Sequence, residues 1–178
     1  MARESGREIC VAYVYIRYSD RADMTVRNVL EIFVKQTVER HPSCLPAVNK
    51  LYAQHIAENT RPTESQLMEL LQQLTSFMTT VYVLDALDEA PPGIQLDLIK
   101  KLGSLDCKVF ITSRPLALVE KHIPDAHRFP IVAQDRDVDL LINQKLNSSV
   151  ELKELLGGTD ASVQAQVVHS IKAKCGGM

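Results

Sequence analysis

The sequence predicts an α/β fold in which a mostly parallel sheet is flanked by helices in three layers. Short apolar segments typical of strands alternate with longer amphipathic segments, and parallel strands need crossover connections of about that length. The chain has 178 residues, of which 46% are hydrophobic, and this is enough to bury the core of one domain. We expect a single α/β domain over residues 1–178, with the sheet core and its crossover helices in 9–132 and a C-terminal helical part in 133–178.

Three segments have the composition of strands. They are rich in β-branched and aromatic residues and are short, as buried strands are. A weaker fourth strand is expected at 128–132. The three main segments are Ile9 to Tyr18 (ICVAYVYIRY), Val81 to Leu84 (VYVL) and Lys108 to Thr112 (KVFIT).

The helices are predicted from apolar residues that recur every three or four positions. The first runs from about Val26 to Val38, and the second from Pro46 to Asn59 with Val48, Leu51, Tyr52 and Ile56 facing inward. A third helix begins at a capping box formed by Thr63 and Gln66, and a fourth begins at Pro92 and ends at a left-handed Gly103. A short fifth helix ends at about His122. Two more are expected, one capped by Asp135 and one over Ser162 to Lys174.

The charge balance excludes a strong general attraction to polyanions. The 20 basic and 22 acidic residues leave a net charge of -2, so no field of the whole molecule draws it to nucleic acid or to an anionic membrane. No apolar stretch approaches the roughly 20 residues that span a bilayer. The start of the chain is charged, and the four cysteines have no CxxC spacing, so we expect a soluble cytoplasmic protein with reduced thiols.

Two motifs place functional side chains at the same edge of the predicted sheet. In VYVLDALDEAPP, an apolar strand ends at Asp85, followed by Asp88 and Glu89. In KVFITSRP, about twenty residues later, a strand is followed by Arg114. Ligands bind outside the carboxyl ends of parallel strands, where carboxylates can hold Mg²⁺ and arginine can bind a phosphate.

Together these motifs resemble the NACHT domain of the STAND class of P-loop NTPases, and the first strand with its helix resembles the fungal type. The resemblance implies that Asp85 coordinates Mg²⁺ through water in a Walker B segment that continues to Asp88 and Glu89. It implies that Asp88 and Glu89 act on the hydrolytic water, and that Arg114, on the sensor 1 strand, reaches the γ-phosphate. The resemblance covers nearly the whole chain.

The sequence departs from this family at the phosphate-binding loop. A P-loop needs GxxxxGK[ST], because its backbone amides and lysine surround the phosphates. None of the seven glycines is followed by lysine, so Walker A is missing, as is the strand before it. We therefore expect a truncated NTPase core that does not bind a nucleotide as tightly as an intact relative does.

The sequence leaves two functions open, and with them the question of whether the chain is an enzyme. One is a remnant of a signalling NTPase that acts through a protein partner or self-association at exposed sheet edges. The alternative is a nuclease, in which Asp85, Asp88 and Glu89 hold Mg²⁺ or Mn²⁺ and Arg114 binds the phosphodiester of a nucleic acid. The simpler interpretations are that the acidic residues cap the next helix and that Arg114 pairs with Asp85 or Asp88.

Overall fold

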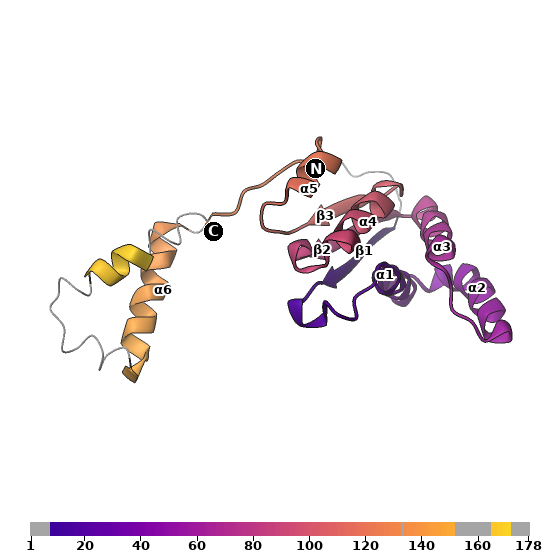
Figure 1. Ribbon diagram of the computed structural model, residues 1–178. Coiled ribbons are helices and arrows are strands. Elements are labelled where there is room, and N and C mark those ends of the chain that lie inside the picture. Colours follow the sequence, from indigo (N-terminus) through magenta and orange to yellow (C-terminus); the bar gives the residue numbers. More distant parts are fainter. Residues whose placement is uncertain (1–7, 133, 152–164, 172–178) are drawn as a thin grey trace. The chain divides into compact units, whose positions relative to one another are not determined.

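A parallel three-stranded sheet lies at the centre of residues 1–125, with its strands in the order β1-β2-β3 (Figure 1). In the register, Tyr15 of β1 lies beside Asp85 of β2, and Val83 of β2 lies beside Phe110 of β3. The expected parallel sheet is confirmed, with the strand that carries the acidic residues in the middle. The strands are β1 (Ile9–Tyr15), β2 (Thr79–Asp85) and β3 (Lys108–Ile111).

The computed structural model describes residues 8–132, 134–151 and 165–171. The chain divides into two compact units, residues 1–125 and 126–178, and each is described by itself. Among the described residues, none of the helices is both long and apolar enough to cross a membrane. The prediction of a single domain over 1–178 stays a prediction.

The helices begin where the sequence places capping residues. The side chain of Thr25 accepts a hydrogen bond from the backbone N–H of Asn28 at the start of α1, and the expected capping box of Thr63 and Gln66 opens α3. The helices of the first unit are α1 (Val26–Arg40), α2 (Leu45–Glu58), α3 (Glu64–Phe77), α4 (Pro92–Gly103) and α5 (Ala117–His122). Short 3-10 turns are η1 (Tyr18–Asp20), η2 (Pro42–Cys44) and η3 (Leu87–Glu89).

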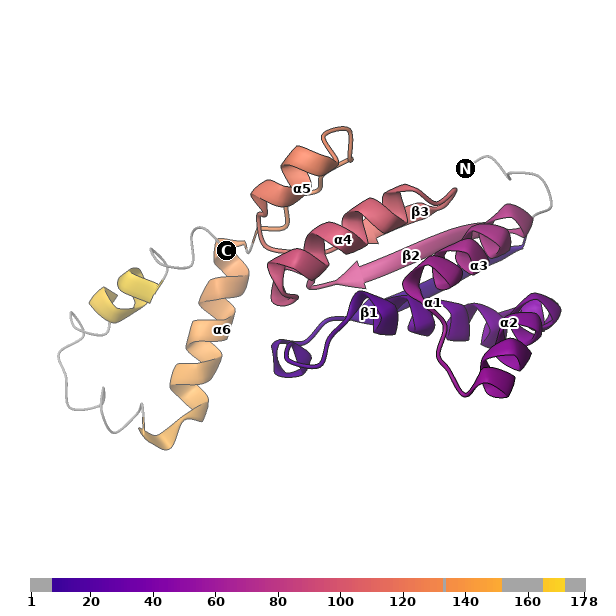
Figure 2. The same ribbon diagram turned by 45° about the vertical axis from the view of Figure 1, so that its right-hand side comes forward.

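One face of the sheet is buried beneath α1, α3 and α4 (Figure 2). Burial alternates strictly along β1 and β2, so every second side chain points into the core. The rings of Phe33 on α1 and Tyr82 on β2 pack with centroids 4.4 Å apart. The predicted fold class, a parallel sheet flanked by helices, is confirmed, and among the described residues α1, α3 and α4 cover this face. Core residues of the sheet are Cys10, Ala12, Val14, Tyr82 and Leu84.

The predicted inner face of α2 is wrong in part. Val48 and Leu51 pack against the core, but Tyr52 and Ile56 are exposed and His55 is buried instead. The buried stripe of α2 is narrow and follows the spacing 48, 51, 55. The Nδ1 atom of His55 lies 2.7 Å from the Thr60 hydroxyl, and this contact compensates one polar atom of the buried ring.

Three other local predictions are corrected. Gly103 belongs to the last turn of α4 and is followed by Ser104 at φ -88°, so no left-handed glycine ends the helix. Residues 128–132 form no strand, because they have no strand beside them in the described part of the second unit, and Phe129 and Ile131 are exposed. Helix α6 (Asp135–Ser148) is preceded by Gln134 at the N-cap, where Asp135 was expected.

The last predicted helix, Ser162 to Lys174, falls mainly outside the described residues. Residues 165–171 are helical.

Candidate functional site at the carboxyl end of the sheet

The turn after β2 brings the acidic residues towards the end of β3. Asp85 is the last residue of β2, and Ala86 follows in the left-handed conformation, with φ 57° and ψ 49°. This conformation costs a non-glycine residue roughly 1 kcal/mol or more, so the surrounding contacts must stabilise it. The chain then enters η3, which carries Asp88 and Glu89.

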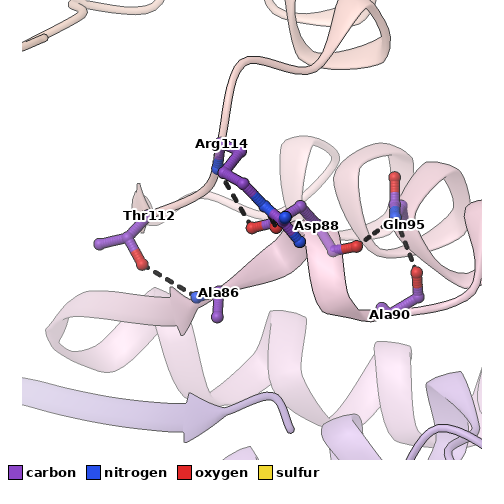
Figure 3. A network of polar contacts seen from close by, with 6 residues as sticks. All are labelled: Ala86, Asp88, Ala90, Gln95, Thr112 and Arg114. Carbon is purple, nitrogen blue, oxygen red and sulfur yellow. Dashed lines mark hydrogen bonds and ion pairs between the residues drawn. The ribbon is translucent and has the colours of Figure 1, made fainter. Parts of the chain in front are cut away.

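Thr112 holds this turn against β3 (Figure 3). Its hydroxyl accepts a hydrogen bond from the backbone N–H of Ala86 at 2.9 Å and donates one to the carboxylate of Asp85. The backbone of Thr112 adds two more hydrogen bonds, donating to Leu84 O and accepting from Leu87 N, both at 2.9 Å. One residue therefore connects four successive residues of the strand end and turn.

Arg114 and Asp88 form an ion pair two residues further along (Figure 3). The guanidinium Nε donates to Asp88 Oδ2 at 2.5 Å, and the Arg114 backbone N–H donates to Asp88 Oδ1 at 3.1 Å. The side chain of Asp88 is 10% exposed, whereas that of Arg114 is 78% exposed. Of the alternatives that the sequence left open, the pairing of Arg114 with Asp88 is the one that forms.

Gln95 fixes the other side of the η3 turn. Its Nε2 donates to Ala90 O at 2.7 Å and to Asp88 O at 3.3 Å, and the residue is buried at the start of α4 (Figure 3). Buried backbone carbonyls need such donors. Gln95 thus holds the backbone of Asp88 while Arg114 holds its side chain.

The predicted metal ligands are Asp85, Asp88 and Glu89. In the part of the chain that the structure describes, no group of three or more His, Cys, Asp or Glu side chains is arranged to hold a metal ion. Asp85 and Asp88 are each engaged by another side chain, Thr112 and Arg114 respectively. The metal role of these residues and the catalytic roles of Asp88, Glu89 and Arg114 stay predictions.

Sequence reasoning missed Thr112 and Gln95. The sequence pattern predicts Thr112 only as the last residue of a strand. Its position at the carboxyl end of a parallel strand is the signal, because the acidic residues lie at that same edge of the sheet. Gln95 lies three residues before Leu98 and four before Ile99, on the inner face of α4. A polar residue in such an apolar stripe was the signal that could have identified it.

The carboxyl of Asp88 has a lowered pKa. Burial raises this pKa, but the hydrogen bonds from the Arg114 side chain and backbone, together with the positive charge, outweigh burial and bring it below the ordinary value. Because folding lowers the pKa, the pair stabilises the protein above the ordinary aspartate pKa. That contribution is lost as the pH falls through the folded-state pKa.

Replacing Arg114 by alanine should therefore raise the pKa of Asp88. We expect NMR titration of the carboxyl carbon to give a higher midpoint in Arg114→Ala than in the parent, whereas Arg61→Ala, which removes an exposed arginine between α2 and α3, leaves the midpoint unchanged. An identical Asp88 midpoint in the parent and in Arg114→Ala would show that the ion pair does not hold in solution.

The comparisons with known proteins give one family. A family model described as the N-terminal region of nephrocystin 3 matches residues 2–114, a segment that ends at Arg114 and includes both motifs of the site. Searches of curated proteins and of solved structures give no match. The family that matches is thus not the NACHT domain that the motifs resemble. Because the match covers more than half of the 178 residues, the chain belongs to the nephrocystin 3 N-terminal family.

Proposed function

We propose that this chain is an NTPase-core remnant of STAND type, related to NACHT domains, that acts in the cytoplasm through protein interaction or signalling rather than as an efficient ATPase. The observation that carries the proposal is the pair of Asp88 and Arg114 at the carboxyl end of a parallel sheet. This is the edge where α/β proteins bind their ligands. Here the arginine that would meet a phosphate is paired with a carboxylate of its own chain.

The absence of a P-loop sequence supports weak nucleotide binding. Phosphate binding in P-loop proteins rests on a glycine-rich loop at a helix N-terminus and on its lysine, and no glycine of this sequence precedes a lysine. A phosphate would also have to compete with Asp88 for Arg114. Protein contacts therefore account for the function better than turnover of ATP does.

ATP and ADP should bind to the full chain no tighter than about 1 mM, because the loop that supplies most phosphate contacts is missing. Isothermal titration calorimetry with each nucleotide, with and without Mg²⁺, measures this. Arg114→Ala is the matched variant, and we expect its titration to be indistinguishable from that of the parent. A micromolar dissociation constant that rises in Arg114→Ala would contradict the proposal and favour a working nucleotide site.

A nuclease is the second candidate, favoured by two carboxylates after the same strand, Asp85 and Asp88, the second of which contacts an exposed arginine. Hydrolysis of a phosphodiester by Mg²⁺ or Mn²⁺ needs carboxylates that hold the ions and a cation that binds the phosphate, and it needs no P-loop. The net charge of -2 would make binding of DNA or RNA weak and sensitive to salt. In this mechanism the metal ion would have to compete with Arg114 for Asp88.

If the chain is a nuclease, it should cleave plasmid DNA or total RNA with Mg²⁺ or Mn²⁺ and lose this activity in EDTA. Asp85→Asn should abolish cleavage, and Asp88→Asn should slow it by roughly 10² to 10⁴, the range for loss of a general base. Asp97→Asn, on the exposed side of α4, is the control and should cleave like the parent. If the parent cleaves nothing with either ion, or if Asp85→Asn cleaves normally, the nuclease proposal fails.

A further inference from the structure

Within the described residues of the first unit, 8–125, the face of the sheet opposite α1, α3 and α4 is apolar and exposed, and it is called the open face below. On β1 and β2 the side chains that alternate with the core residues point to this face, and Phe110 of β3 joins them in the register beside Val83. The five most exposed apolar side chains of this open face are between 39% and 67% exposed: Ile9, Val11, Tyr13, Tyr15 and Phe110.

The topology explains why this face is open. Crossovers between parallel strands are right-handed in nearly all proteins, so two crossovers that step in the same direction across a sheet place their helices on the same face. The order β1-β2-β3 is such an arrangement, and α1, α3 and α4 accordingly share one core. Parallel sheets are normally covered on both faces, and exposed apolar patches of this kind mark interaction sites.

The outer edge of β1 is closed to a further strand. The Gln36 side chain accepts from Tyr13 N at 3.0 Å and donates to Tyr13 O at 2.8 Å, and Arg40 Nη1 donates to Val11 O at 2.5 Å. The Arg40 guanidinium also lies over the Tyr13 ring, 5.3 Å from its centroid. Association at the β1 edge would break these contacts, whereas association through the open face would keep them.

We propose that two copies of the chain associate face to face through the open face. With five side chains about half exposed, each copy would bury roughly 500 Å² of apolar surface. The pair would then bury about 1,000 Å², which is below the ~1,200–2,000 Å² of specific, stable interfaces and in the range of weak, transient ones. Such an interface is of a size that gives a weak, concentration-dependent dimer.

Charge on the open face fits a two-fold axis that reverses the strand direction. Lys108 begins β3 beside Val81, and Asp85 ends β2 beside Tyr15, so a basic and an acidic residue lie on the face four positions apart along β2. A two-fold axis perpendicular to the strands brings the Lys108 end of one copy over the Asp85 end of the other. The surface is therefore complementary to itself, as the interface of a two-fold dimer must be.

Sedimentation of the full chain over a range from micromolar to millimolar concentration tests the proposal. We expect the mass of the parent to rise from that of one 19.9 kDa chain towards that of two. Tyr15→Lys and Phe110→Lys should each raise the dissociation constant at least tenfold, because each would bury a charge in the interface. Tyr52→Lys and Phe77→Lys are the matched controls, because these aromatic side chains are exposed on helices, and they should dimerise like the parent.

A parent that stays monomeric at the highest concentration would overturn the proposal by itself, whatever the variants do. A dimer that survives both face variants, each folded by circular dichroism, would also overturn it and would indicate association at the β3 edge.

Discussion

The centre of this structure is strand β2, which is paired on both sides and fixed at its carboxyl end by Thr112. Pairing with β1 and β3 sets the direction of the strand, and the alternation along it separates a buried face from an open one. The four hydrogen bonds of Thr112 then decide where the chain goes after Asp85. The left-handed Ala86, the η3 turn and the position of Asp88 all follow from this connection.

The same connection keeps the acidic residues close to Arg114 without requiring a ligand. The carboxylate of Asp85 accepts a hydrogen bond from Thr112, and that of Asp88 accepts two from Arg114. The charge of Asp88 is thus compensated within the chain by Arg114, while Asp85 accepts from a neutral hydroxyl. Exposed apolar side chains lie on the open face of the sheet, which Asp85 borders beside Tyr15.

Much of the fold could be predicted because local patterns determine it. The apolar segments that became β1, β2 and β3, the capping box of Thr63 and the periodic helices α1 and α3 are each specified by neighbouring residues. The failures came where tertiary contacts decide. Two sets of apolar and polar residues in α2 have helical spacing and could face the core. In the structure, the set that includes His55 is the one that packs inward. Residues 128–132 have strand composition but found no neighbour to pair with.

The residues of the site were predicted more completely than their contacts. The motifs identify Asp88 and Arg114, and their opposite charges allow the pairing that the structure shows. The two hydrogen bonds of the Thr112 hydroxyl could not be foreseen, because they require Ala86 to adopt a conformation that alanine disfavours. The role of Gln95 could not be predicted, because the periodic apolar residues around it indicate only a helix face that packs on the core. In both cases the cause is the need to satisfy buried backbone groups, which sequence periodicity does not report.

The measurement that tests the central role of Thr112 most directly is hydrogen exchange at the Ala86 amide, combined with urea unfolding. Thr112→Val removes the hydroxyl and should leave the Ala86 N–H without its acceptor. We therefore expect faster exchange at Ala86 and a loss of about 1–3 kcal/mol in the free energy of unfolding. Thr112→Ser keeps the hydroxyl and should retain the protection of Ala86. If Thr112→Val protected the Ala86 amide and unfolded like the parent, the hydroxyl would not be what holds this edge of the sheet.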